Sequence, residues 1–508
     1  MNQLSVKPTA QELASQIKAG KIPKGFDIPK WNSSMPLYDH QMQAALWMYL
    51  TPKGILADDT GLGKTCSVLA LLHLLKQRGK LGPDKRAIII VPAISVLTSW
   101  KADGFDKFGP DLKFAVGRGT PKKRKEIYND DSWEVLLTNY ELVRTDRKLL
   151  EEMDFRFVAL DEADYIKNHA AQMTQAVKAI SVDADRVVAM TATPIQNSLL
   201  DLHSILEAMG LNKVFGSKTA FDRRYHEHKV EKIRTRKRTI YKKTVIGYKN
   251  TQELKKKLAP YYLRRTYTDL GDMDLPDLRT QVRTLEMTPE QKQMYADVKR
   301  GFAHLTPNSP PKEIRNAVFK LRQVCTGTYT AGAEKDSSCK LDWLERTLQT
   351  GWLDTKVVIF SSWKTTIYAL EKRLDDAGLG YVTITADDGN QKRREEKRQK
   401  FWNDPKTNVL IGTTAIEKSL NLQCANVQVN IDMLYNPAKH HQLAGRVRRM
   451  DSVHDEAWVI SLQTESTIEA KVMKTLEQKQ AISNHIFGDS EELFDALSPQ
   501  ELLDMIRS

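Results

Sequence analysis

A chain of 508 residues is too long for one ordinary hydrophobic core, so two or three domains are expected. The composition, 41% hydrophobic and 28% charged, is that of a soluble globular protein and excludes a disordered chain. The net charge of +13 favours a polyanionic partner, although basic proteins that bind no nucleic acid are equally common.

Neither cysteine chemistry nor a membrane is expected to define this protein. The four cysteines lie far apart and form no C-x-x-C pair, so we expect free thiols and no zinc site. The N-terminal segment lacks the apolar core of a signal peptide, and the most apolar run, residues 87–97, is too short to span a bilayer. We expect a cytoplasmic location; the basic run at residues 121–125 leaves a nuclear location open.

Short apolar, β-branched runs alternate with helical patterns in two series along the chain. The first series comprises residues 87–91, 134–138, 155–160 and 186–190, and the second comprises residues 356–360, 381–384, 408–411, 427–431 and 457–462. Strands that alternate with helices predict parallel sheets covered by helices. The fold class is therefore α/β, with two parallel-sheet lobes.

The segment between the two series is helical in pattern and strongly basic. It divides the predicted chain into a first lobe at residues 1–214, a helical connector at 215–338, a second lobe at 339–478 and a short helical tail at 479–508. The polar residues 331–339 are the best candidate for a linker before the second lobe.

A phosphate-binding loop is predicted at residues 58–65, which read DDTGLGKT between an apolar strand and a helical run. Gly61 and Gly63 allow backbone N–H groups to face phosphates, and the following helix adds the partial positive charge of its N-terminus. Lys64 would reach the β- and γ-phosphates, and the Thr65 hydroxyl would bind Mg²⁺. Asp58 replaces the usual small residue. The predicted nucleotide-binding residues of the loop are Asp59, Thr60, Gly61, Leu62, Gly63, Lys64 and Thr65.

Two acidic residues follow the strand predicted at 155–160. Open α/β sheets bind ligands at the carboxyl ends of their strands, which is where Asp161 and Glu162 would lie. Asp161 suits Mg²⁺, and Glu162 would orient and deprotonate the attacking water. Thr191 and Thr193 follow the next strand, and we expect these hydroxyls to sense the nucleotide and couple its state to the second lobe.

An arginine-rich segment of the second lobe reads QLAGRVRR at residues 442–449. Arg446 and Arg449 are three residues apart and share one face if the segment is helical. Arginine stays charged and makes paired hydrogen bonds, so both residues are candidate arginine fingers for a γ-phosphate. Gln442 is a further candidate for coupling. The alternative is a basic helix that faces solvent or nucleic acid.

In their order along the chain, these residues resemble the Swi/Snf-like family of superfamily-two DNA translocases, over residues 37–478. The matching motifs are LYDHQ (37–41), DDTGLGKT (58–65), DEADYIKN (161–168), TATPIQN (191–197), LAPYYLRRTYTDLGDMDLP (258–276), MTPEQKQMY (287–295), LRQVCTG (321–327), KVVIFSSW (356–363), TTAIEKSLNLQ (413–423) and QLAGRVRR (442–449). The resemblance assigns Gln41 to the adenine base. Departures from the family pattern are Asp59 and Thr60 for Glu-Met, Asp164 for His, and Lys418 and Ser419 where glycine is expected.

This resemblance implies two RecA-like lobes, ATP and Mg²⁺ as cofactors, and ATP-driven tracking along duplex DNA with little or no strand separation. It also implies a monomeric motor without accessory modules, for which branched DNA and DNA-bound proteins are further candidate partners. The basic residues of the connector are candidates for phosphate contacts, because such contacts need charge and no base readout. They are Arg234, Arg236, Lys237, Arg238, Lys242 and Lys243.

Other interpretations stay open at this point. The connector residues also suit a solvated basic loop. A strand-separating or branch-migrating helicase would carry the same motifs, and a non-hydrolysing nucleic-acid clamp would keep the fold alone. The clamp is disfavoured because Lys64, Asp161, Glu162, Arg446 and Arg449 are all present. The biological task is left open.

Overall fold

The computed structural model forms two compact units, Met1–Gly271 and Asp272–Ser508, which are described separately. It describes residues 10–21, 36–109, 111–192, 194–195, 198–234, 239–270, 276–306, 309–385, 387–388, 391–413, 422–433, 443–445, 447–448, 452–472, 502–504 and 506. In this described part of the chain no helix has the length and apolar character needed to cross a membrane.

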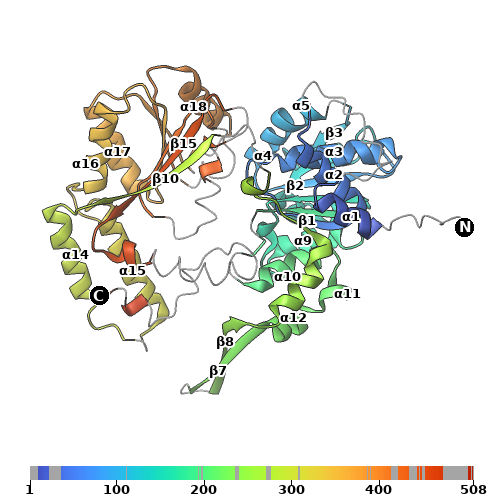
Figure 1. Ribbon diagram of the computed structural model, residues 1–508, viewed down its shortest axis with the longest axis horizontal. Coiled ribbons are helices and arrows are strands. Elements are labelled where there is room, and N and C mark those ends of the chain that lie inside the picture. Colours follow the sequence, from blue (N-terminus) through green and yellow to red (C-terminus); the bar gives the residue numbers. More distant parts are fainter. Residues whose placement is uncertain are drawn as a thin grey trace, which may run out of the picture. The chain divides into compact units, whose positions relative to one another are not determined.

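The first unit is built on a seven-stranded sheet whose strand pairs all run parallel (Figure 1). In spatial order its strands are β3 (Phe114–Val116), β4 (Val135–Asn139), β2 (Ala87–Val91), β5 (Phe157–Asp161), β6 (Arg186–Met190), β1 (Lys53–Leu56) and β9 (Tyr262–Leu263). Each strand predicted in the first lobe is present within two residues of its expected bounds. Parallel pairing places the carboxyl ends of these strands at one edge, where the predicted site residues follow them.

Helices cover the sheet because its strands are apolar on both sides. Ile89 of β2 belongs to a buried cluster with α2 (Asp39–Leu50) and α3 (Lys64–Gln77), whereas its neighbours Ile88 and Ile90 are buried outside that cluster. A strand buried on both faces reads as a continuous apolar run, as AIIIV does. The other helical segments are α1 (Ala10–Lys18), α4 (Ile94–Ser99), η1 (Trp100–Phe105), α5 (Asp106–Phe108), α6 (Pro121–Tyr128), α7 (Tyr140–Thr145), α8 (Arg147–Glu151), η2 (Ala163–Ile166), α9 (Gln172–Ser181), α10 (Leu199–Ala208), α11 (Asn212–Phe215), α12 (Lys218–Tyr225), α13 (Thr251–Leu258), η3 (Ala259–Tyr261) and η4 (Tyr267–Leu270).

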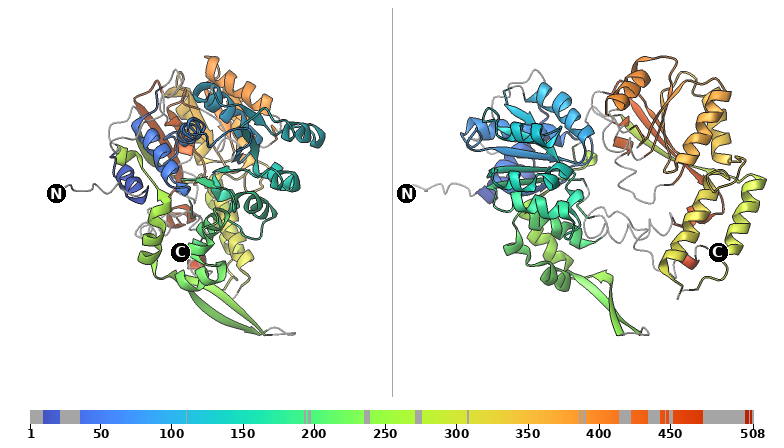
Figure 2. Two further views of the ribbon diagram at one scale, coloured as in Figure 1. Left: turned by 90° about the vertical axis from the view of Figure 1, so that its right-hand side faces the viewer. Right: turned by 180° about the vertical axis from the view of Figure 1, so that it is seen from behind.

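An antiparallel hairpin extends away from the sheet of this first unit (Figure 2). It consists of β7 (His226–Arg234) and β8 (Thr239–Tyr248). The expectation of a wholly helical connector is therefore wrong here, and also at β9 and at β10 (Asp277–Leu285). Arg234 lies on β7, and Lys242 and Lys243 lie on β8. Arg236, Lys237 and Arg238 lie outside the described residues.

The second unit contains a six-stranded sheet whose strand pairs are also all parallel. Its spatial order is β10, β15 (Glu456–Thr464), β14 (Val427–Asn430), β11 (Val357–Phe360), β13 (Val409–Gly412) and β12 (Tyr381–Ile384). The five strands predicted for the second lobe are thus present. Its helices are α14 (Pro289–Gly301), α15 (Pro311–Thr326), α16 (Cys339–Thr350), α17 (Lys364–Asp376) and α18 (Gln391–Asn403).

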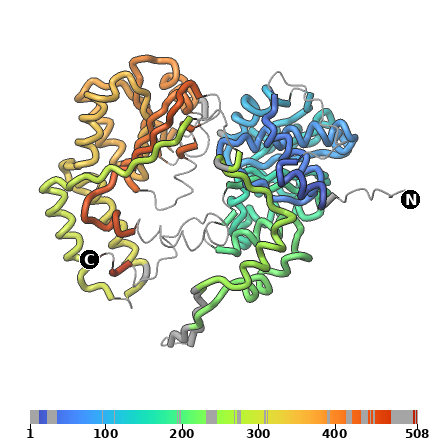
Figure 3. Tube along the Cα trace, in the orientation of Figure 1, coloured from blue at the N-terminus to red at the C-terminus, as the bar shows by residue number. Residues whose placement is uncertain are grey.

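The connector belongs in part to each unit, as the chain trace in Figure 3 shows. β9 adds an edge strand to the first sheet beside β1, and β10 adds an edge strand to the second sheet beside β15. The passage between the units at residues 271–272 falls inside the segment predicted as connector. The subdivision at residues 214, 338 and 478 stays a prediction. Of the predicted tail, residues 502–504 are helical, and Leu502 and Leu503 share a buried cluster with residues of α15.

Candidate active site

The phosphate loop lies between β1 and α3, as the sequence predicts. Gly61 and Gly63 have φ values of 92° and 75°, a left-handed conformation that side-chain-bearing residues adopt only with strain. Gly63 directly precedes α3, so the first N–H groups of that helix open onto the loop. Lys64 Nζ donates to the carbonyl oxygens of Asp58 at 2.7 Å and Asp59 at 3.2 Å. The loop and its lysine are therefore placed to surround a polyphosphate.

Asp58, which stands where such loops usually have a small residue, is buried and paired with an arginine. Its carboxylate accepts hydrogen bonds from Nε and one terminal nitrogen of Arg265, and only 1% of the Asp58 surface is exposed. Arg265 comes from the segment after β9, 207 residues away in the sequence. In the sequence this segment is visible only as part of the family signature at residues 258–276, which indicates no role for Arg265.

Asp161 ends β5 and is held by a buried tryptophan. Trp100 Nε1 donates to Asp161 Oδ2 at 2.8 Å. Burial and the neighbouring charge of Glu162 raise the pKa of Asp161 to about 7, while the Trp100 hydrogen bond and the charge of Lys64 oppose that rise. A cation at this carboxylate would favour its charged form. The residues therefore fit Mg²⁺ held by Asp161 next to the Lys64 ammonium.

Glu162 has an unusual backbone and a carboxylate oxygen without a protein partner. Its φ and ψ values are 48° and 61°, the left-handed region that strains a side-chain-bearing residue. Its Oε2 atom is buried and has no hydrogen-bond partner among the described residues. A strained residue whose carboxylate is uncommitted is typical of a functional site, and here it can orient a reactant next to Asp161.

Tyr140 directly follows β4 and supports the carboxylate pair from two strands away, since β2 lies between β4 and β5. Its hydroxyl donates to the backbone oxygen of Asp161 at 2.9 Å, and its ring stacks on Tyr165 with centroids 5.3 Å apart. Sequence reasoning missed both Trp100 and Tyr140. The available signal was an aromatic residue shortly after a predicted strand, which by itself is more often a core residue.

Gln41 lies close to the phosphate loop, at the start of α2. It is buried, its Nε2 is 3.4 Å from the carbonyl oxygen of Leu62, and its Oε1 accepts from the backbone N–H of Tyr38 at 3.2 Å. The neighbouring His40 donates from Nε2 to the same Leu62 oxygen at 2.8 Å. These contacts join α2 to the loop, and an adenine contact by Gln41 stays a prediction.

Among the predicted coupling residues, the structure describes Thr191. It is buried at the end of β6, and its backbone N–H donates to the Leu56 carbonyl of β1 at 3.2 Å. Thr191 thus lies between the strand that carries the phosphate loop and the strand that carries Asp161. The remaining predicted catalytic and coupling residues, Thr193, Gln442, Arg446 and Arg449, lie outside the described residues.

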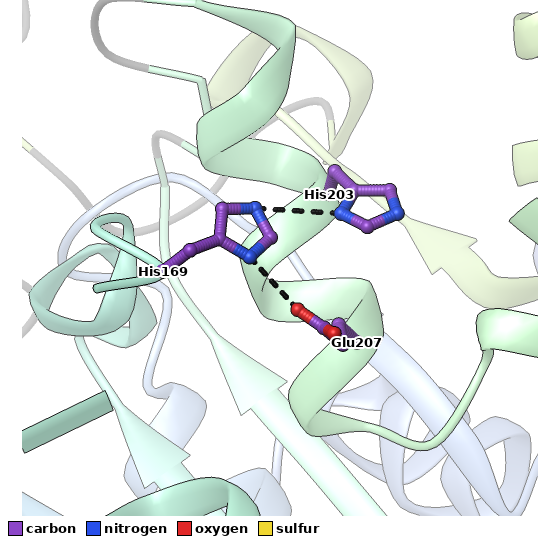
Figure 4. A group of neighbouring side chains, drawn as sticks. All are labelled: His169, His203 and Glu207. Atoms are coloured by element: carbon purple, nitrogen blue, oxygen red, sulfur yellow. Dashed lines mark hydrogen bonds and ion pairs between the residues drawn. The ribbon is translucent and has the colours of Figure 1, made fainter. Parts of the chain in front are cut away.

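His169 forms a polar cluster with His203 and Glu207 of α10 (Figure 4). The atoms of these residues that could bind a metal lie within 4.8 Å of one another. His169 Nδ1 lies 2.8 Å from Glu207 Oε2, and His203 Nδ1 lies 3.4 Å from His169 Nε2. Lys178 donates to the same Glu207 oxygen and lies 3.3 Å from His169 Nδ1. Because this ammonium already neutralises Glu207 and would repel a metal ion, the cluster is a structural link between the segment after Glu162 and α10.

Comparisons with known proteins identify the family to which this chain belongs. The model of the SNF2-related domain matches residues 40–330, more than half of the chain, and the helicase conserved C-terminal domain matches residues 339–451. An uncharacterized ATP-dependent helicase of Mycoplasma pneumoniae is 28% identical over 462 residues, which cover 89% of this chain and 42% of that protein. A putative ATP-dependent helicase/translocase of Bacillus subtilis is 28% identical over 509 residues, which cover 96% of this chain and 52% of that protein.

More distant matches extend to eukaryotic and archaeal proteins. A SWI/SNF chromatin-remodeling complex subunit of Schizosaccharomyces pombe is 26% identical over 96% of this chain and 30% of its own length. The SWI2/SNF2 ATPase core of Sulfolobus solfataricus, solved with double-stranded DNA, is 25% identical and covers 94% of this chain and 99% of its own, with a TM-score of 0.43. The chain spans about half or less of the curated relatives that it matches. Because the SNF2-related domain model matches more than half of its residues, the chain belongs to the SNF2-related family of superfamily-two helicase-type ATPases.

Proposed function

We propose that this chain hydrolyses ATP with Mg²⁺ and uses the energy to move along double-stranded DNA without separating its strands. The observation that carries the hydrolytic part is the carboxylate pair at the end of β5. Asp161 accepts a hydrogen bond from Trp100 and interacts electrostatically with the Lys64 ammonium. The adjacent Glu162 has a buried carboxylate oxygen that has no hydrogen-bond partner among the described residues. A non-hydrolysing clamp has no need of that combination.

The proposed roles follow from what each group can do during phosphoryl transfer. Lys64 would neutralise the β- and γ-phosphates, and Thr65 and Asp161 would hold the metal ion. Mg²⁺, when bound, would supply positive charge that offsets the charge of the phosphates. Glu162 orients the attacking water and accepts its proton. Arg446 and Arg449 are proposed as the arginine fingers, and the coupling role is proposed for Thr191, Thr193 and Gln442.

Charge and the hairpin support duplex DNA as the proposed track. The hairpin residues 226–248 contain eight Lys and Arg residues against two Glu residues, and the whole chain carries a net charge of +13. β7 and β8 extend away from the sheet, and Val230 on β7 is 60% exposed. A positive, projecting ribbon suits phosphate contacts, which give affinity without sequence preference. We therefore keep Arg234, Lys242 and Lys243, with the basic residues 236–238, as proposed DNA contacts.

A triplex-displacement assay tests the proposal directly. A motor that tracks along a duplex pushes off a third strand that lies in its path, whereas a clamp leaves it in place. We expect ATP-dependent displacement by the wild type, none by Glu162→Gln, and no unwinding of a forked duplex by either. Unwinding of the fork would indicate a strand-separating helicase instead. Absence of displacement by a wild-type protein that hydrolyses ATP would contradict translocation.

A further inference from the structure

Asp58 of the phosphate loop and Arg265 form a buried ion pair that has no part in the proposed catalytic steps. Arg265 Nε donates to Asp58 Oδ1 at 3.1 Å, and a terminal nitrogen donates to Oδ2, so the pair is bidentate. The other terminal nitrogen of Arg265 donates to the His40 carbonyl at 2.6 Å. The Arg265 side chain is 9% exposed and the Asp58 side chain is 1% exposed. The guanidinium therefore joins the loop to the start of α2 as well.

The backbone around Arg265 also holds the first half of the loop. β9 pairs in parallel with β1, and this pairing continues past the strands into the loop. The N–H of Ala57 donates to the Leu263 oxygen at 2.7 Å, and the N–H of Asp59 donates to the Arg265 oxygen at 3.0 Å. The hydroxyl of Tyr267 donates to the Thr60 oxygen. Residues 57–60 are thus fixed by one short segment that lies more than 200 residues later in the chain.

The negative charge of Asp58 connects this ion pair to nucleotide binding. Most phosphate loops have a small residue here, and a carboxylate that is buried in the loop and uncompensated would repel the nucleotide's phosphates. A lysine would offset the charge but could not make the paired, planar contact of a guanidinium. We propose that Arg265 is a positioning residue of the ATP site, which neutralises Asp58 and holds residues 57–60 in their phosphate-binding conformation. This inference rests on the proposed ATP hydrolysis and on none of the proposed DNA contacts.

The test is equilibrium binding of a fluorescent ATP analogue, with Mg²⁺ and without DNA, to charge variants of the pair. Arg265→Gln should weaken binding by roughly tenfold or more, because the Asp58 charge is then unopposed. Asp58→Asn alone should weaken binding less. The double variant Asp58→Asn/Arg265→Gln should regain most of the lost affinity, and Arg265→Lys should fall between wild type and Arg265→Gln. Because removal of both charges would also restore fold stability, affinity is measured where every variant is fully folded, and the control pair below separates stability from nucleotide affinity.

Arg124 and Asp146 provide a matched control in the same unit. They form a bidentate pair at 2.5 and 2.7 Å with side chains 5% and 8% exposed, and none of their recorded hydrogen bonds reaches the phosphate loop. Arg124→Gln should lower the thermal unfolding midpoint as Arg265→Gln does, yet leave nucleotide affinity within about twofold of wild type.

Two results would overturn the inference. One is unchanged nucleotide affinity in folded Arg265→Gln, and the other is an Asp58→Asn/Arg265→Gln protein that binds no better than Arg265→Gln. If Arg265→Gln does not fold, the double variant is compared with wild type: an affinity close to wild type supports the inference, and an affinity roughly tenfold weaker or worse overturns it. A wild-type protein that binds no ATP analogue would refute the proposed function itself, which is a different outcome.

Discussion

Replacement of Trp100 by phenylalanine tests how Asp161, the proposed metal ligand, is held. The change keeps an aromatic ring in a buried position but removes the N–H that lies 2.8 Å from Asp161 Oδ2. Hydrogen bonds to charged groups are worth about 1.5–3 kcal/mol, or roughly 10- to 150-fold in an equilibrium constant. Because this bond lowers the pKa of Asp161, its loss should raise that pKa further above about 7. A protonated carboxyl binds Mg²⁺ poorly, so the Mg²⁺ concentration for half-maximal ATP hydrolysis should rise by that factor.

The assay is a Mg²⁺ titration of ATP hydrolysis at pH 7 and again at pH 9. The deficit of Trp100→Phe should shrink at the higher pH, because a larger fraction of Asp161 is then ionised in the variant than at pH 7. Trp133→Phe is the matched control, since Trp133 is equally buried and donates from Nε1 to the Ile127 oxygen at 2.9 Å, away from the site. Equal Mg²⁺ requirements for Trp100→Phe and wild type would refute the assigned role of the hydrogen bond.

Three further predictions concern the catalytic residues, the hairpin and one buried histidine. Lys64→Ala should weaken ATP binding, because the lysine contacts the phosphates in the ground state. Glu162→Gln should keep ATP binding and lose turnover, because the glutamate acts on the attacking water. Near-normal turnover of Glu162→Gln would contradict that role of Glu162. Neutralisation of the basic residues at 234–243 should reduce the slope of log affinity against log salt by about 0.9 per lost phosphate contact, and parallel plots would show a solvated hairpin instead. Burial lowers the pKa of His203, so the unfolded chain takes up a proton there that the folded chain does not, and stability is lost as pH falls below about 6.5. His203→Phe should therefore flatten the pH dependence of the unfolding free energy between about pH 7 and 5, and an unchanged dependence in chemical denaturation would contradict this reasoning.

Local patterns predicted the elements that are apolar or that carry a glycine-containing turn. The run AIIIV becomes β2 because both of its faces are buried, and Gly61 and Gly63 mark the phosphate loop because they adopt left-handed conformations. Asp161 and Glu162 are predicted as site residues because they follow an apolar run, and that run forms the buried strand β5. In each case the signal lies within about ten consecutive residues.

The sequence was misleading where strands are polar or where partners lie far apart. β10 is an edge strand with mostly exposed residues, and charged residues interrupt the apolar residues of β7 and β8, so none of them shows a long apolar run. β9 has only two residues and is specified by its pairing with β1. Trp100 meets Asp161 across 61 residues and Arg265 meets Asp58 across 207, and such contacts follow from sheet topology that no local pattern encodes.

The most direct test of the account is the steady-state rate of ATP hydrolysis with no DNA, with single-stranded DNA and with duplex DNA of the same length. A duplex-tracking motor of this family should hydrolyse ATP slowly by itself and be stimulated well above the single-stranded value by the duplex. The stimulated rate should vanish in Glu162→Gln. Equal stimulation by single strands, or a rate that duplex DNA leaves unchanged, would contradict the claim that this ATP site drives movement along double-stranded DNA.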